Sequence, residues 1–386
     1  MSSQIKVIQS YPVWLPQTQT WMYNQIRCLP ETVESHILCD RTQNLDQFNL
    51  PNIHALEYLP STQYLWDKLL RKLKLRRYLA HGIDVAQQYQ ATILHSHFGQ
   101  IGWGDRGLAK RAGLKHVVTF YGQDVSYLPQ QNPRWFQRYR QLFGLVDRVL
   151  CEGPHMASCV IQLGCAAEKV QVLHLGVSVD EIPFQPRVWQ AGEPFRVLIA
   201  ASFREKKGIP DAITALGQLQ HHVPLEITII GDASAEPRCQ AEKQKILDAI
   251  AHYKLQSKIR MLGFQPHSVF FEEAYQHHLF LSPSVTSSDG DTEGGAPVSL
   301  IEVAASGMPI VSTTHCDIPE VIQHKVTGLL APEHHVDQLV SHLKWFVDHP
   351  QDWTPMLNAA RHWIEQEFDV YTQAQKLAKI YQELLD

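Results

Sequence analysis

The sequence lacks the features that mark membrane-spanning, secreted and metal-binding proteins. No apolar run is long enough to span a bilayer, and the first residues have neither the charged nor the hydrophobic region of a signal peptide. The seven cysteines form no Cys-x-x-Cys pair, and the 21 histidines show no His-Glu-x-x-His spacing. We therefore expect neither a disulfide framework nor a metal site, no cofactor, and a cytoplasmic location.

The sequence also lacks an excess of basic residues. Its 39 acidic residues outnumber 34 lysines and arginines, and the net charge of −5 argues against a nucleic-acid partner. At 386 residues with 44% hydrophobic content, the chain is long enough to bury two cores of ordinary domain size.

Short apolar runs alternate with helical stretches along the whole chain. This alternation predicts an α/β protein made of two units with mainly parallel sheets. The runs that we expect to form strands are 5–9, 36–39, 91–97, 116–120, 149–151 and 170–173 in the first half, and 196–200, 226–230, 259–262, 279–281, 310–313 and 328–330 in the second.

Segment 176–194 separates the two series of strands. It holds three prolines and no helical pattern. We interpret it as the connector between an N-terminal domain, residues 1–178, and a C-terminal domain, residues 190–366. The last segment, 367–386, has apolar residues at helical spacing and predicts a terminal amphipathic helix.

The most informative stretch runs from Asp289 to Ser312. A glycine pair and Pro297 lead into a short helical run that ends at Gly307, and a buried strand follows. The free N–H groups at the start of such a helix carry a partial positive charge and bind phosphate. Glu302, about one and a half turns into the helix, can accept hydrogen bonds from sugar hydroxyls. A phosphate cradle beside a hydroxyl acceptor predicts a nucleotide-sugar site.

This stretch resembles the group 1, or family-4, retaining glycosyltransferases of GT-B fold. Glu293-Gly and Glu302, then a small-residue helix and Gly307-Met-Pro-Ile-Val, match the hallmark of that family, although the eight residues between the glutamates are one more than usual. The resemblance implies an α/β GT-B fold of two Rossmann-like domains facing a central cleft, with the C-terminal helix crossing back to the first domain. It implies metal-independent transfer of a sugar from a UDP-sugar or GDP-sugar to a hydroxyl group, with retention of configuration.

The resemblance also implies roles on the donor side. Lys207, directly before a glycine, is implied as a phosphate contact. The usual arginine position holds Ser202, and Arg204 either reaches the phosphate by another route or is an ordinary solvated residue. Glu302 is implied as the ribose ligand and Glu293 as a neighbour of the transferred sugar. The other donor-binding residues contribute mainly backbone groups: Gly294, Gly295, Ala296, Pro297 and Val298 toward the distal phosphate and sugar, and Gly263 and Phe264 toward the base. Gly231 ends a strand, and as a glycine it lets the backbone come close to a ligand.

The acceptor side of the resemblance lies in the first half of the chain. His97 ends a strand, where ligands gather in parallel sheets, and Tyr121 stands where the family usually has a histidine close to the transferred sugar. We expect His97 to supply the imidazole, or else to be a structural histidine that closes the strand. Asp124 either orients the acceptor or caps the following turn. These three residues and Glu293 are the predicted catalytic residues.

Residues 65–79 form a basic amphipathic stretch inside an acidic protein. Six leucines are interspersed with six lysines or arginines. This combination suits anionic lipid headgroups, and it would hold the protein on the inner face of the membrane. The alternative is an ordinary domain helix with a solvated basic face.

The sequence leaves three functions open. We expect a retaining transferase of cell-surface polysaccharide or glycolipid synthesis, with a nucleoside-diphosphate sugar as donor and a sugar or lipid-linked acceptor. The departures at Ser202 and Tyr121 would also fit a catalytically degenerate partner subunit that binds a nucleotide sugar. A sugar-nucleotide epimerase of the same fold is the third alternative.

Overall fold

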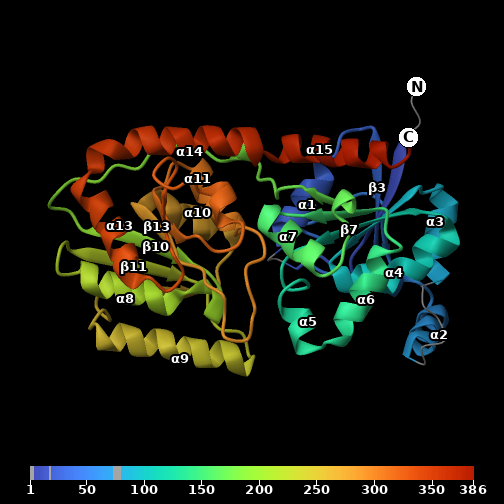
Figure 1. Ribbon diagram of the computed structural model, residues 1–386, viewed down its shortest axis with the longest axis horizontal. Helices are drawn as coiled ribbons and strands as arrows, with labels where there is room; N and C mark the ends of the chain where they lie inside the picture. Colours follow the sequence, from blue (N-terminus) through green and yellow to red (C-terminus); the bar gives the residue numbers. More distant parts are fainter. Residues whose placement is uncertain (1–3, 17–18, 73–79) are drawn as a thin grey trace. The chain divides into compact units, whose positions relative to one another are not determined.

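The chain folds into two compact units, each built on a parallel sheet with helices against both faces (Figure 1). The computed structural model describes residues 4–16, 19–72 and 80–386. The first unit consists of Met1–Ser178 and Asp369–Asp386, and the second of Val179–Phe368. The α/β class predicted from the sequence is confirmed.

The first unit has a seven-stranded sheet in the order β5-β3-β1-β6-β7-β8-β9, and every neighbouring pair is parallel. The six strands predicted for this half are all present. Strand β5 was not predicted. The bounds are β1 Ile5–Ser10, β3 Val33–Cys39, β5 Ile53–Ala55, β6 Ile93–His97, β7 Lys115–Phe120, β8 Arg148–Cys151 and β9 Val170–Val172, and a separate short pair joins β2 Val13–Trp14 to β4 Arg41–Thr42.

The helices of the first unit include the last helix of the chain. Their bounds are α1 Thr20–Arg27, α2 Ser61–Lys72, α3 Ala80–Tyr89, α4 Gly99–Ala112, α5 Tyr127–Gln131, α6 Arg134–Phe143, α7 Pro154–Gln162 and α15 Val370–Glu383. Helix α15 buries Leu377 and Tyr381 in the same cluster as Ile5 and Val7 of β1, so its apolar stripe completes the core of this unit. The side chain of Asp369 caps the helix by accepting a hydrogen bond from the backbone of Thr372.

The second unit has a six-stranded parallel sheet in the order β12-β11-β10-β13-β14-β15. All six strands predicted for this half are present. The bounds are β10 Phe195–Ala200, β11 Leu225–Ile230, β12 Ile259–Gly263, β13 Leu279–Ser282, β14 Ile310–Thr313 and β15 Leu329–Ala331, with helices α8 Ile209–Leu219, α9 Pro237–His252, α10 His267–Gln276, α11 Val298–Ala305, α12 Ile318–Val321, α13 Val336–Asp348 and α14 Trp353–Glu367.

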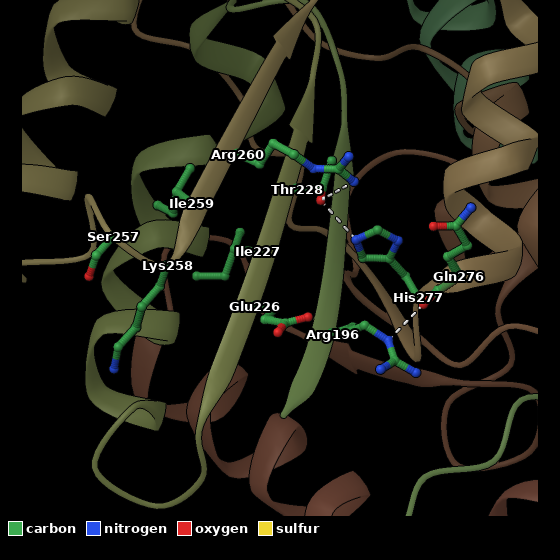
Figure 2. Close-up of a pocket in the computed structure, with 10 residues that line it drawn as sticks. All are labelled: Arg196, Glu226, Ile227, Thr228, Ser257, Lys258, Ile259, Arg260, Gln276 and His277. Atoms are coloured by element: carbon green, nitrogen blue, oxygen red, sulfur yellow. Dashed lines mark hydrogen bonds between the residues drawn. The ribbon is translucent and has the colours of Figure 1, made fainter. Parts of the chain in front are cut away.

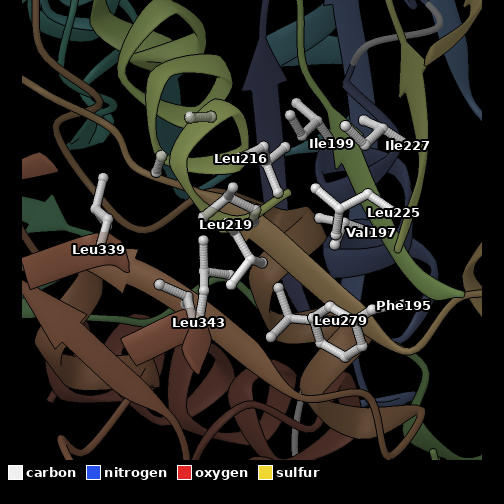
Figure 3. Packing of buried hydrophobic residues seen from close by; sticks show 14 of the residues in the cluster. Phe195, Val197, Ile199, Leu216, Leu219, Leu225, Ile227, Leu279, Leu339 and Leu343 are labelled. Carbon is white, nitrogen blue, oxygen red and sulfur yellow. The ribbon is translucent and has the colours of Figure 1, made fainter. Parts of the chain in front are cut away.

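The core of the second unit forms where helices α8 and α13 pack on the sheet. Strand residues such as Phe195 and Leu279 meet Leu216, Leu219 and Leu343 of those helices (Figure 3). The strand order reverses between β10 and β13, so the loops that follow these two strands diverge at the same edge of the sheet. Ligands of open parallel sheets bind at such a switch point.

The expected connector, 176–194, is only partly a connector. Residues from Val179 onward belong to the second unit. Trp189 is buried in that unit's core, and the Arg187 guanidinium donates hydrogen bonds to the carbonyl groups of Ala274 and Ser306. The prolines kept this segment out of regular helices, but its buried side chains make it part of the second unit.

Helix α2 contains the first eight residues, 65–72, of the basic stretch 65–79. Its Leu65 and Trp66 side chains are 61% and 60% exposed. Residues 73–79 and the side chains of Lys68, Arg71 and Lys72 lie outside the described part of the chain. Among the described residues, every helix is too short or too polar to cross a bilayer.

The cap of α15 gives a test of how the terminal helix is held. We expect Asp369→Ala to lower the free energy of unfolding by about 1 kcal/mol, because the amide of Thr372 loses its partner. Urea unfolding followed by circular dichroism would measure it. The control is Asp352→Ala, because Asp352 occupies the same position before α14 without a capping bond. Equal losses in both variants would contradict the capping role.

Candidate active site

The turn after β10 is folded against the loop after β13. Its 3₁₀ segment, Glu205–Lys207, ends at Gly208, where φ is +62°. A Cβ atom at Gly208 would lie 1.9 Å from the carbonyl oxygen of Pro283, so only glycine allows this approach. The two loops therefore meet at the switch point of the sheet, and Lys207 reaches the residues that precede α11.

Lys207 forms a buried ion pair with Glu293. The Lys207 Nζ lies 2.7 Å from Glu293 Oε1, and the hydroxyl of Ser284 donates to the same oxygen at 2.8 Å. Burial would raise the pKa of Glu293, but Lys207 and Lys206 outweigh it and lower the pKa to about 2. Glu293 is thus a carboxylate at neutral pH, able to accept hydrogen bonds from a sugar but not to donate a proton.

Arg204 and Lys206 both bind Asp291. The Arg204 Nη2 lies 2.5 Å from Asp291 Oδ2, and the Lys206 Nζ lies 3.3 Å from Oδ1 and 2.6 Å from the carbonyl oxygen of Thr292. The Arg204 guanidinium is therefore engaged by a carboxylate, and its contact with a phosphate stays a prediction. Neither Lys206 nor Asp291 was predicted. The only signal for Lys206 was its place in a basic turn.

Asp289 and Asp291 have the Asp-x-Asp form of a metal motif. Arg238 binds Asp289 at 3.1 Å, while Asp291 is taken by the two cations described above. Within residues 4–16, 19–72 and 80–386, no group of three His, Cys, Asp or Glu side chains is arranged to hold a metal ion.

Helix α11 begins directly after the ion pair. Gly294 has a φ of +80°, and Pro297 precedes Val298, the first helical residue. Glu302, on the same helix, is buried, and its Oε1 lies 2.8 Å from His267 Nε2. The hydrogen bond to Glu302 raises the pKa of His267. His267 was not predicted from the sequence, where it is one of many histidines without a ligand spacing.

The two glycines at the strand ends differ in what they allow. A Cβ atom at Gly231 would lie 2.0 Å from the carbonyl oxygen of Ala201, so this glycine allows a close approach within the protein, and its approach to a ligand stays a prediction. No atom lies within 4 Å of a Cβ atom built at Gly263, and the next residue, Phe264, is 62% exposed. The segment after β12 therefore has space beside it.

On the first unit, His97 is buried and hydrogen-bonded at both ring nitrogens. Nδ1 lies 2.6 Å from the hydroxyl of Tyr121, and Nε2 lies 3.1 Å from the amide oxygen of Gln9. Burial lowers the pKa of His97 to about 3, so the ring is neutral. Because an amide oxygen only accepts, the proton is on Nε2 and Tyr121 donates to Nδ1. This is the arrangement of a structural histidine, and a catalytic role for His97 stays a prediction.

Asp124 and Tyr121 are tied to the same part of the first unit. The Asp124 carboxylate accepts backbone N–H bonds from Gly99 at 2.7 Å and Tyr121 at 3.0 Å, so it joins the start of α4 to the loop after β7. Burial raises the pKa of Asp124 to about 6. The Tyr121 ring packs against Trp21, with centroids 4.5 Å apart, and against Phe98. The two bonds of Asp124 go to Gly99 and to the preceding Tyr121, and a role of Asp124 in acceptor binding stays a prediction.

A separate groove of about 570 Å³ lies on the second unit, over the starts of β10, β11 and β12. Figure 2 shows Arg260 and His277 converging on the hydroxyl of Thr228. Arg196 bonds to the carbonyl oxygen of Gln276. The polar groups of this groove thus bond mainly to one another, and it lies away from the carboxyl ends of the strands.

Comparison with protein families identifies both halves of the chain. Residues 18–181 match the model described as Glycosyltransferase Family 4, and residues 181–366 match the model described as Glycosyl transferases group 1. The amylovoran biosynthesis glycosyltransferase AmsK of Erwinia amylovora is 33% identical, over 77% of this chain and 71% of the relative. The putative colanic acid biosynthesis glycosyltransferase WcaL of Escherichia coli K12 is 32% identical, over 78% and 73%.

Comparison with solved structures finds the same fold. The Anabaena protein HepE, solved in complex with UDP, superposes with a TM-score of 0.78 at 16% identity over 98% of this chain and 100% of that chain. A glycosyltransferase of Rickettsia africae superposes with a TM-score of 0.77 at 17% identity over 99% of both chains. Both superpositions extend over nearly the whole chain, and the GT-B fold class is confirmed.

The ion pair of Glu293 should make the free energy of unfolding depend on pH in the acid range. Its folded pKa of about 2 lies below the ordinary value of 4.5, so the stability it contributes is present above pH 4.5 and is lost as the pH falls toward 2. We expect Glu293→Gln to cost about 3 kcal/mol at pH 7, and the difference from wild type to shrink below pH 4.5. Urea unfolding across this pH range measures it.

The matched control for the acid series is Glu272→Gln, which removes an exposed glutamate from the same unit. Its unfolding curve should stay close to that of the wild type at every pH. A Glu293→Gln difference that is the same at pH 7 and pH 3 would show that the carboxylate is not stabilised by the two lysines.

Proposed function

Because the chain belongs to the group 1, family-4 glycosyltransferases, we propose that it transfers a sugar from a nucleoside-diphosphate sugar to a hydroxyl acceptor with retention of configuration. The observation that carries the proposal is the Lys207–Glu293 pair at the start of α11, on the helix that also bears Glu302. In this proposal, the cation and the two carboxylates contact one bound donor. The Anabaena protein HepE, which is similar in structure, was solved in complex with UDP and with UDP-glucose.

On the nucleotide, Glu302 accepts hydrogen bonds from the two ribose hydroxyls. One oxygen of this carboxylate is held by His267, which a ribose hydroxyl would replace or share. Lys207 and the N–H groups from Gly294 to Val298 contact the diphosphate, since a lysine and a helix N-terminus both favour anions. The base lies beside Gly263 and Phe264, where a Cβ atom would meet open space.

The sugar hydroxyls donate hydrogen bonds to the Glu293 carboxylate. Lys207 then interacts with the phosphate as well as with Glu293. The bond between the anomeric carbon and the phosphate oxygen breaks, and the acceptor oxygen joins the same face of that carbon. The acceptor proton passes to the departing phosphate oxygen. Lys207 and the start of α11 stabilise the charge that develops on the leaving diphosphate, without a divalent metal.

The acceptor is proposed to meet Tyr121 and Asp124 of the first unit. The relatives AmsK and WcaL carry the names of amylovoran and colanic acid biosynthesis, which supports a sugar or lipid-linked acceptor of a cell-surface polysaccharide. We propose a cytoplasmic location for this step.

A degenerate partner subunit is the second candidate. The observation in its favour is that Arg204 is bound to Asp291 and that Ser202 fills the usual arginine position. Such a protein would bind a nucleotide sugar without releasing nucleoside diphosphate in the presence of any acceptor. Turnover therefore separates the two functions, and an isomerised donor instead of free nucleoside diphosphate would indicate an epimerase.

A thermal-shift titration tests the donor site. We expect one of UDP, GDP and ADP, without added metal, to stabilise the wild type by about 2.7 kcal/mol at a hundred times its dissociation constant. Glu302→Ala should abolish this shift, because the ribose loses its acceptor. Glu272→Ala is the control, since it removes an exposed carboxylate from α10 with the same change of charge. No shift with any of the three nucleotides would refute donor binding.

Helix α2 supports a second element of the proposal, docking on an anionic bilayer surface. Leu65, Trp66 and Leu69 are exposed on a helix whose sequence is rich in lysine and arginine. Large apolar side chains next to basic residues suit the headgroup boundary of anionic lipids.

Vesicle sedimentation tests this surface. We expect the wild type to bind vesicles of phosphatidylcholine with phosphatidylglycerol more tightly than phosphatidylcholine alone. The double change Leu65→Ser, Trp66→Ser should weaken this binding at least about tenfold, because two apolar side chains are lost. The control changes Phe136→Ser and Leu145→Ser remove exposed apolar residues elsewhere on the first unit. Equal losses for both doubles, or no preference for the anionic lipid, would exclude a specific role of α2.

A further inference from the structure

A buried histidine contacts the backbone of Glu293. His315 follows β14 and is 1% exposed. Its Nε2 lies 3.0 Å from the backbone nitrogen of Glu293, and its Nδ1 lies 2.6 Å from Glu333 Oε1. A backbone N–H can only donate, so Nε2 is the acceptor and the proton lies on Nδ1, which donates to the carboxylate. The neutral imidazole therefore links two loops by one bond at each nitrogen.

Glu333 holds the His315 ring through Nδ1, the nitrogen that does not face Glu293. Its other carboxylate oxygen, Oε2, accepts the backbone N–H of Thr286 at 2.7 Å. Burial would raise the pKa of Glu333, but the bonds from Thr286 and His315 outweigh it and lower the pKa. Thr286, His315 and Glu333 follow β13, β14 and β15, which are neighbours in the sheet. The hydrogen bonds from Thr286 through Glu333 and His315 to Glu293 thus connect the ends of three adjacent strands.

Cys316 keeps this loop close to the donor loop. Cys316 has a φ of +48°, in the left-handed region that favours glycine, and its thiol bonds to Thr292 and Gly294. The thiol also lies 3.2 Å from His315 Nε2, but it is a weaker donor than the Glu293 amide. Burial raises the pKa of the thiol to about 12, which makes it inert.

We propose that His315 is a positioning residue for Glu293, oriented by Glu333, and that it sets the place of the carboxylate beside the transferred sugar. The inference rests on the proposed function, because it needs Glu293 to face that sugar. His315 acts on the backbone of Glu293 and not on the helix that carries Glu302. Its loss should therefore impair the sugar-transfer step and leave nucleotide binding nearly intact.

The test compares turnover with nucleotide affinity. The donor is whichever of UDP-glucose, UDP-galactose and GDP-mannose the wild type converts fastest to free nucleoside diphosphate, and the affinity is that of UDP or GDP by calorimetry. We expect His315→Ala to lower kcat by about tenfold to a hundredfold, because a misplaced catalytic group reacts slowly. The nucleotide dissociation constant should change less than about threefold, since Glu302 and α11 remain in place.

Two further variants separate positioning from general stability. His315→Gln keeps an acceptor for the Glu293 amide and should recover part of kcat, while Glu333→Gln should lower kcat less than His315→Ala does. The control is His342→Gln, because His342 is a buried histidine of the same unit whose Nε2 bonds to the carbonyl of Leu330. It should leave kcat unchanged. Equal losses of turnover and nucleotide affinity in His315→Ala, or an unchanged kcat, would overturn the proposal.

Amide hydrogen exchange keeps the inference testable if the wild type converts none of the three donors. That outcome on the wild type alone counts against the proposed function. The peptide that contains Glu293 should then still exchange faster in His315→Ala than in the wild type or His342→Gln, because its amide has lost an acceptor. Unchanged exchange in this peptide would overturn the positioning role, whatever the function.

Discussion

A cluster of five charged side chains, two of them buried and three partly buried, determines the geometry of the proposed donor site. Arg204, Lys206 and Lys207 come from the turn after β10, and Asp291 and Glu293 come from the loop before α11. An unpaired buried charge costs several kcal/mol, so neither loop can leave the other without a large loss of stability. The turn and the loop are therefore held together by their charges.

The same cluster accounts for the affinity that we propose for an anion. Three cations face two carboxylates, which leaves one positive charge beside the start of α11, whose backbone N–H groups also favour an anion. Arg204 and Lys206 neutralise Asp291 and hold the loop, while Lys207 is shared between Glu293 and the proposed diphosphate. These separate roles, holding the loop and contacting the diphosphate, account for three basic residues on one short turn.

Sequence patterns predicted the strands and the motif well because both depend on local order. Most predicted strands are short apolar runs whose residues are largely buried, and such runs can be recognised in a sequence without knowledge of their partners; the edge strands β9 and β12 are only half-buried or exposed. The short strand β5, Ile53–Ala55, was not predicted from the sequence, because it forms by pairing with β3. The contacts of Arg204 and Gly231 inside the protein could not be predicted for a related reason: each has a neighbour far away in sequence, Asp291 and Ala201 respectively.

By itself, the sequence determined the α/β class, the positions of the strands and the glutamate motif at the start of α11, since these follow from periodicity and from residues close together in the chain. Only the tertiary structure decided which charges pair, that His97 is closed off by Gln9 and Tyr121, and that His315 reaches the Glu293 backbone. The reason is physical. A hydrogen bond or an ion pair depends on a distance of a few ångströms, and that distance is set by how separate strands and loops assemble.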